Sequence, residues 1–250
     1  DSFSKRVNDI YNDETKQRSS LLTEIKNLKE LNNQISNDAI NLTKALKGQN
    51  KTQVDWGEMI LSSILDQTGL REGKEYTIQG SFTSSEGKRL RPDVIVHLPS
   101  NKDIVIDSKV SLNAYINYSK AENEDEKQQA SKELVKSITS HIKDLSSKSY
   151  ENIDGVRNLD FVLMFIPIEG AFLLATSSDD NLFKLAFDNN IMLVSPSTLY
   201  VTLRTIENIW RNEHQNENAQ LISKKAADLY DKFVAFVGDI EDIGTNITRT

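Results

Sequence analysis

The chain has 250 residues, a formal net charge of −7 and a sequence pI near 5.1, and it contains no cysteine. The lack of cysteine excludes disulfides, thiolate metal sites and cysteine nucleophiles. The acidic balance argues against a protein that coats nucleic acid by bulk electrostatics. No apolar run is long enough to span a membrane and no signal-peptide pattern opens the chain, so we expect a cytoplasmic protein. Because the chain begins at Asp1 rather than Met, we expect an excised or processed fragment, and a membrane tether upstream stays open.

Residues 1–48 predict a coiled-coil arm. The segment has no proline, and no glycine before Gly48, and its apolar or small residues recur in alternating steps of four and three, which is a heptad seam. The seam consists of Leu21, Ile25, Leu28, Asn32, Ile35, Ala39, Leu42 and Leu46. A polar residue such as Asn32 at a core position fixes register in dimeric coils, so we expect self-association through this arm, in parallel or antiparallel pairing. The alternative is one amphipathic helix folded back on the domain.

The rest of the chain, residues 51–244, predicts an α/β domain built around a small mixed sheet. Gly69 is a natural stop for the first helix, and the alternation around residues 99–102 predicts a hairpin. The expected strands are 76–82, 93–98, 103–110, 161–166 and 191–194. The expected helices are 52–67, 111–149 with an interruption at 122–127, 169–189 and 198–243.

The last helix is predicted to begin with Ser195 as N-cap and Pro196 in the first turn. It carries two apolar stripes at helical spacing. The first stripe contains Leu199, Leu203, Ile206 and Trp210, and the second contains Ile222, Ala226, Leu229, Phe233, Phe236 and Ile240.

The chemistry of the chain is concentrated in the predicted hairpin. Strand side chains alternate between faces, so Asp107 and Lys109 project to the same side of the sheet, and the apolar run before them predicts a central strand. Asp93 begins the partner strand, where its carboxylate can meet that of Asp107. Charges on a central strand are costly unless they pair, bind a metal or open into a cleft. A satisfied buried ion network is therefore the alternative to a catalytic site.

Two converging carboxylates predict a divalent cation, because oxygen ligands suit Mg²⁺ or Mn²⁺. A lysine beside them is placed to orient or deprotonate a water, or to balance the charge of a phosphate. Metal, water and Lys109 together predict hydrolytic attack on a phosphodiester.

The pattern Pro92-Asp93 followed by Asp107-Ser108-Lys109 resembles the PD-(D/E)XK nuclease superfamily. Longer blocks resemble the RmuC family of DNA-recombination proteins, over about residues 55–244. These blocks are Leu90–Val96, Val105–Tyr115, His141–Tyr150, Phe161–Glu169, Leu193–Leu199 and Trp210–Ala219. The resemblance implies a restriction-endonuclease-like domain behind a coiled coil, acting on DNA and either limiting or processing recombination intermediates.

The resemblance also implies roles for individual residues. Asp93 and Asp107 would hold the metal with the carbonyl of Ser108, and Lys109 would position the water. The superfamily adds an acidic residue from the first core helix, for which Glu58 is our candidate; a solvated flank position is the alternative. The chain shows no sequence motif for a small-molecule cofactor.

Contacts to DNA are predicted from basic residues near this site and on helices. Lys88, Arg89 and Arg91 precede Asp93 and are our first choice for phosphate contact, although an exposed loop can carry such charges for solubility alone. Further candidates are His141, Arg204 and Arg211, each of which also fits an ordinary surface helix position. Two other functions stay open, a DNA-binding regulator that does not cut and a coiled-coil scaffold that recognises protein.

Overall fold

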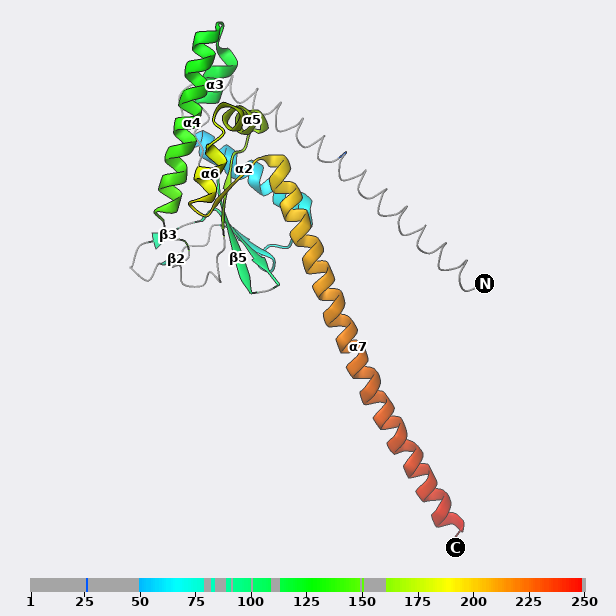
Figure 1. The fold of residues 1–250 in the computed structure, drawn as a ribbon. Coiled ribbons are helices and arrows are strands. Elements are labelled where there is room, and N and C mark those ends of the chain that lie inside the picture. The colour runs from blue at the N-terminus through cyan, green and yellow to red at the C-terminus, as the bar shows by residue number, and fades with distance from the viewer. Residues whose placement is uncertain are drawn as a thin grey trace. The chain divides into compact units, whose positions relative to one another are not determined.

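The computed structural model describes residues 26, 50–78, 82–83, 89–90, 92–99, 101–108, 113–148, 150 and 161–248. Side chains are described over these residues apart from 50–55, 82–83, 89–90 and 239–248. The chain divides into two compact units, residues 1–205 and 206–250, and Figure 1 shows its helices and strands. The predicted seam from Leu21 to Leu46 lies outside the described residues, so the coiled-coil arm stays a prediction.

The first unit contains a five-stranded mixed sheet in the order β1-β4-β5-β6-β7. Its strands are β1 (Tyr76–Ile78), β4 (Val94–Leu98), β5 (Lys102–Asp107), β6 (Val162–Phe165) and β7 (Ile191–Val194). The first three pair antiparallel, and β5, β6 and β7 pair parallel. The predicted mixed α/β sheet and the central position of β5 are therefore confirmed. Strand β6 is buried along its whole length, as its unbroken apolar run indicates.

The strand predicted over residues 76–82 is wrong in its extent. β1 ends at Ile78, and Phe82 belongs to β2 (Phe82–Thr83), which pairs with β3 (Arg89–Leu90) in a separate two-stranded sheet. A period of two predicts strands but does not tell where one sheet is left for another, because that depends on pairing partners distant in the sequence.

Helix α2 (Asn50–Thr68) confirms the first predicted helix, and Gly69 ends it with φ 84°, the left-handed conformation that glycine adopts without strain. The hydroxyl of Thr68 donates to the carbonyl of Leu65 over 2.7 Å, which satisfies one of the last carbonyls. Apart from Thr68, the buried side chains described on α2 are apolar. They are Trp56, Ile60, Leu61, Ile64 and Leu65.

Helices α3 (Asn113–Lys120) and α4 (Glu124–Ser146) pack side by side in Figure 1. The interruption predicted over residues 122–127 is too long, because α4 already begins at Glu124. Asn123 caps it by accepting a hydrogen bond from the Glu126 amide over 2.8 Å, and three acidic residues in the first turn favour the positive end of the helix dipole. The buried stripe of α4 consists of Ala130, Leu134, Ile138, Ile142 and Leu145.

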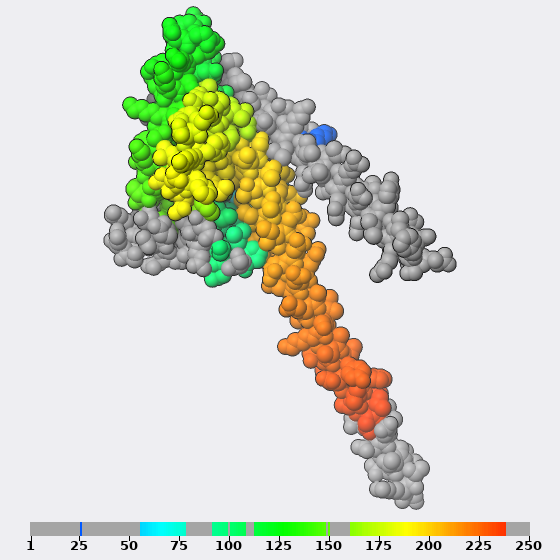
Figure 2. Space-filling model, in the orientation of Figure 1, coloured from blue at the N-terminus to red at the C-terminus, as the bar shows by residue number. Residues whose placement is uncertain are grey.

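The helical stretch predicted over residues 169–189 is two helices, α5 (Glu169–Ser178) and α6 (Leu182–Phe187). Figure 2 shows their surface beside that of α3 and α4. Between them the Asp179 carboxylate accepts a hydrogen bond from the Asn181 amide over 2.9 Å. This Asx turn competes with continued helix.

The last helix, α7 (Pro196–Thr248), begins as predicted. The Ser195 hydroxyl accepts a hydrogen bond from the Thr198 amide over 3.3 Å, which is the N-cap interaction. Glu169 supports the same turn, since its carboxylate accepts from the Ser195 hydroxyl over 2.9 Å and from the Ser197 amide over 3.2 Å. Among the residues that the structure describes, no helix has the length and apolar character to cross a membrane.

Candidate active site

The two predicted aspartates lie at one end of the β4–β5 hairpin. The antiparallel register pairs Val94 with Ile106, and this places Asp93 and Asp107 at opposite positions one step further along. Asp93 is 7% exposed and Asp107 1% exposed. The hairpin therefore places two buried carboxyl groups at the same end of two neighbouring strands.

Asp93 is held by the residue that follows Asp107. Its Oδ2 atom accepts hydrogen bonds from the Ser108 amide over 2.7 Å and from the Ser108 hydroxyl over 3.1 Å. Because Ser108 is also buried, this pair of bonds closes the end of the hairpin and fixes the direction of the Asp93 carboxylate.

Asp107 is held by two residues from beyond α4. Its Oδ2 atom accepts hydrogen bonds from Lys148 Nζ over 3.0 Å and from the Tyr150 hydroxyl over 2.9 Å. Lys148 Nζ also donates to the Tyr150 hydroxyl over 3.2 Å. The carboxylate charge is therefore balanced by one ammonium group and supported by one phenol.

The Tyr150 hydroxyl is a donor at any physiological pH. Burial is the main cause that raises its pKa, and the negative charge of Asp107, the hydrogen bond to Asp107 and the charge of Asp93 add to it. A phenol with a raised pKa stays protonated, so Tyr150 keeps its proton directed at the Asp107 carboxylate.

Sequence reasoning did not single out Lys148 or Tyr150. They lie 41 and 43 residues after Asp107, beyond the end of a long helix, and no periodicity connects them to the hairpin. The block from His141 to Tyr150 resembles the RmuC family, and this was the available sign that residues other than His141 matter there.

His141 is half-buried on α4. Its pKa is lowered from the ordinary value chiefly by burial, while Asp144 and Asp107 act in the raising direction and Lys148 in the lowering direction. A neutral imidazole can donate and accept one hydrogen bond each. The influence of Asp107 and Lys148 indicates that His141 shares the electrostatic environment of the Asp107 cluster.

Helix α2 closes over this end of the hairpin at Gly57. A Cβ atom there would lie 3.5 Å from the Ser108 carbonyl oxygen and 3.7 Å from Pro167 Cγ, so the helix backbone passes directly beside the hairpin. Glu58 follows and is half-buried. Its predicted catalytic role stays a prediction.

Other predicted site residues lie beyond what the structure describes. Lys88, Arg91 and Lys109 fall outside the described residues, and Arg89 is described only by its backbone in β3. The predicted water-positioning and phosphate-binding roles of these residues stay predictions.

The two predicted DNA-contacting arginines of α7 have interactions within their own units. Arg204 Nη1 donates to the Thr68 carbonyl over 2.8 Å at the end of α2. Arg211 forms hydrogen bonds of 3.2 Å and 2.6 Å with the Glu207 carboxylate. These contacts account structurally for both side chains, and a contact of either with DNA stays a prediction.

The oxygen donors of the site are of the type that a hard divalent cation prefers. Within the described part of the chain no three acidic or histidine side chains form a cluster suited to a metal, but Mg²⁺ needs only one or two carboxylates because it keeps several waters. The aspartates and the nearby Ser108 carbonyl are oxygen ligands of this kind. The ammonium of Lys148 already pairs with Asp107 over 3.0 Å, so a cation held by Asp107 would compete with Lys148 for this carboxylate.

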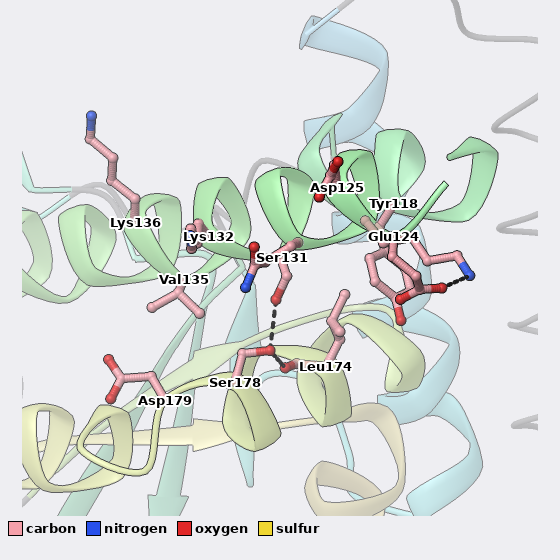
Figure 3. A pocket seen from close by; sticks show the side chains of 12 residues that line it. Tyr118, Glu124, Asp125, Ser131, Lys132, Val135, Lys136, Leu174, Ser178 and Asp179 are labelled. Atoms are coloured by element: carbon pink, nitrogen blue, oxygen red, sulfur yellow. Dashed lines mark hydrogen bonds and ion pairs between the residues drawn. The ribbon is translucent and has the colours of Figure 1, made fainter. Parts of the chain in front are cut away.

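A separate hollow lies between α3, α4 and α5, with a volume of about 760 Å³ (Figure 3). Ser131 and Ser178 share a hydrogen bond of 2.7 Å across it, and its rim carries both signs of charge, including Lys132, Lys136 and Asp179. Among the described residues its lining includes none of the predicted site residues. The hollow is therefore distinct from the hairpin site.

The fold and site define a mixed α/β domain with two buried aspartates on a central hairpin. Comparison with known proteins assigns it further: the model of the RmuC family matches residues 1–250, and the chain belongs to that family. It is 51% identical over 244 residues to the DNA recombination protein RmuC homolog of Vibrio cholerae, covering 98% of this chain and 48% of that protein. It is 49% identical over 249 residues to the DNA recombination protein RmuC of Escherichia coli, covering 100% of this chain and 52% of that protein. The chain thus spans about half the length of these relatives.

Proposed function

We propose that this chain is the nuclease domain of a DNA-recombination protein, which hydrolyses DNA phosphodiesters in a reaction that requires Mg²⁺ or Mn²⁺. The names of its relatives support a role in recombination. By resemblance to the PD-(D/E)XK pattern, we assign it a restriction-endonuclease-like arrangement. We further propose that residues 1–48 form a coiled coil through which copies of the protein associate, and that the domain limits or processes recombination intermediates.

One observation carries the proposal: two nearly fully buried aspartates occupy opposite positions at the end of a hairpin, with a lysine and a tyrosine directed at one of them. Buried carboxylates are expensive in free energy unless they are paired or bind a cation. A domain retains such groups in spite of their cost when they are needed for chemistry.

We assign Asp93, Asp107 and the Ser108 carbonyl to holding the divalent cation. When bound, the cation would neutralise charge on the phosphate and lower the pKa of a bound water. Lys109 orients the attacking water, Glu58 completes the acidic set from α2, and Lys88, Arg89 and Arg91 hold the DNA phosphates. Tyr150 keeps the Asp107 carboxylate in one direction by its hydrogen bond.

The test is cleavage of labelled linear and branched DNA with Mg²⁺ or Mn²⁺ by the wild type, Asp107→Asn and Lys109→Ala. Asp188→Asn is a matched control, because Asp188 is an exposed carboxylate at the C-terminal end of α6, away from the hairpin residues. We expect metal-dependent cutting that the first two variants lose by at least about a hundredfold and the control retains. If the wild type is folded and binds DNA but does not cut it, catalysis is rejected.

A second candidate function is a DNA-binding regulator that does not cut. The observation in its favour is that Asp107 Oδ2 already accepts two hydrogen bonds, one from an ammonium group, as a purely structural ion pair would. A protein-recognising scaffold is a third reading. Binding to DNA at varied salt separates it from the other two, since phosphate contact gives a steep salt dependence.

A further inference from the structure

The second unit presents a row of large apolar side chains to solvent. On α7, Ile222 and Leu229 are each 69% exposed, Phe233 is 61% exposed and Phe236 is 58% exposed. This segment is drawn in orange to red in Figure 2. Single exposed apolar residues are ordinary, but a contiguous row on one helix face marks an interaction surface.

The spacing of the row specifies the type of partner. Ile222, Ala226, Leu229, Phe233 and Phe236 follow alternating steps of four and three residues, so they form a heptad seam that fits another helix. Tyr230 and Val237 lie beside the seam and are also exposed, which widens the apolar face on one side. We call the five residues from Ile222 to Phe236 at these heptad positions the α7 seam.

We propose that the α7 seam pairs with the α7 seam of a second copy of this chain, in an antiparallel register centred on Asp231. This register places Ala226 against Phe236 of the second copy and Leu229 against its Phe233. A small residue therefore meets a large one at each outer layer, and the seam fills without cavities or overpacking.

A parallel pair would be packed much less evenly. Each layer would then contain two copies of one residue, so Ala226 would face alanine and leave a void, while Phe233 and Phe236 would each face phenylalanine and force the helices apart. Voids and overpacking each cost stability in a helical interface. The size pattern of the seam therefore favours the antiparallel pair.

The charges that flank the seam and the area that it would bury are compatible with this register. Lys232 faces its own counterpart, and a long lysine side chain can turn its charge to solvent. Aromatic side chains each bury roughly 150–250 Å² when fully covered, so two seams bury on the order of 1,000 Å², the size at which an interface becomes specific.

The absence of cysteine from the chain allows a direct test by disulfide trapping in the full chain. Two variants, Ala226→Cys and Phe236→Cys, are oxidised separately and as a mixture. The antiparallel register predicts a disulfide-linked dimer in the mixture and very little in either variant alone. Self-linking of Ala226→Cys alone, or no link in the mixture, would overturn the register.

Light scattering over a range of protein concentrations tests the surface itself. We expect Phe233→Asp to raise the dissociation constant of the dimer by about a hundredfold or more, since it buries a charge in an apolar seam. Leu221→Asp is the matched control, because Leu221 is also a large exposed apolar residue of α7 (53%, against 61% for Phe233) but lies off the seam. A wild type that stays monomeric, or a Phe233→Asp variant that dimerises like the wild type through another segment such as residues 21–46, would refute the proposal.

Discussion

The hairpin site buries charged side chains, whereas the α7 seam exposes apolar ones. Both arrangements are unfavourable in free energy unless the side chains find partners. At the site, charged groups are buried, and Asp107 is matched by Lys148 and Tyr150 within 3.0 Å. On the seam, apolar groups such as Leu229 are exposed, and their cost is hydrophobic rather than electrostatic. The charged groups of the site find their partners within one unit. The apolar side chains of the seam can be buried only against a partner.

The largest effect that tests this comparison comes from shortening one apolar side chain in each unit. Ile138→Ala, at a fully buried position of α4, should lower the free energy of unfolding by about 2–5 kcal/mol because it leaves a cavity. Leu229→Ala should change the stability of the monomer by no more than about 0.5 kcal/mol, while weakening the dimer. Urea unfolding at low protein concentration measures both. If Leu229→Ala costs as much as Ile138→Ala, the seam is already covered within one chain.

The next effect concerns the pairing of Asp107 with Lys148. Asp107→Asn and Lys148→Met should each lower the free energy of unfolding by about 1–3 kcal/mol, because each leaves a partly or fully buried group without its charged partner. The double variant should lose less than the sum, with a coupling of about 1 kcal/mol. A double-mutant cycle on the exposed ion pair of Glu124 and Lys127 should show no measurable coupling energy. Additive losses at the site would mean that Asp107 and Lys148 do not stabilise one another.

The sequence predicted the parts of the fold that follow from periodicity. The apolar run before Asp107 predicted a central strand, and β5 is the middle strand of five. The Ser195-Pro196 start of α7 followed from local capping chemistry, which is readable residue by residue. The start of α4 was also readable, since Asn123 and Glu126 have capping-box spacing, but the charged stretch around it was interpreted as an interruption.

Only the hairpin part of the candidate site could be predicted from the sequence. Asp93 and Asp107 come to opposite positions because a hairpin fixes its own register locally. Lys148 reaches Asp107 because α4 packs on the core and returns the chain to the sheet, a tertiary result with no pattern at the spacing of 41 residues. The exposure of the α7 seam was likewise unavailable from sequence, because the same periodicity is typical of a helix that packs on its own domain.

A smaller effect concerns the affinity of the site for a divalent cation. If Asp107 binds Mn²⁺, the Lys148 ammonium competes for the same carboxylate, so Lys148→Met should tighten Mn²⁺ binding by about tenfold. Calorimetry without DNA measures this independently of cleavage. Lys143→Met, a charge removal at an exposed position in the last turn of α4, should leave the affinity unchanged, and Asp107→Asn should abolish binding. Weaker binding by Lys148→Met would show that the lysine supports the metal site rather than competing with it.

The smallest effect is a pH dependence of stability, which we expect to arise from the site and not from the seam. Burial lowers the pKa of His141 below its ordinary 6.5, so the unfolded chain binds a proton before the folded one does. The contribution of His141 to stability is therefore present above pH 6.5 and lost as the pH falls through the lowered pKa. We expect His141→Gln to lose less melting temperature than the wild type between pH 7.5 and 5.5. Asp144→Asn should lose more, because Asp144 acts to raise the same pKa. If all three proteins lose the same melting temperature, the acid sensitivity arises from other residues. His141 would then not be coupled to the cluster around Asp107.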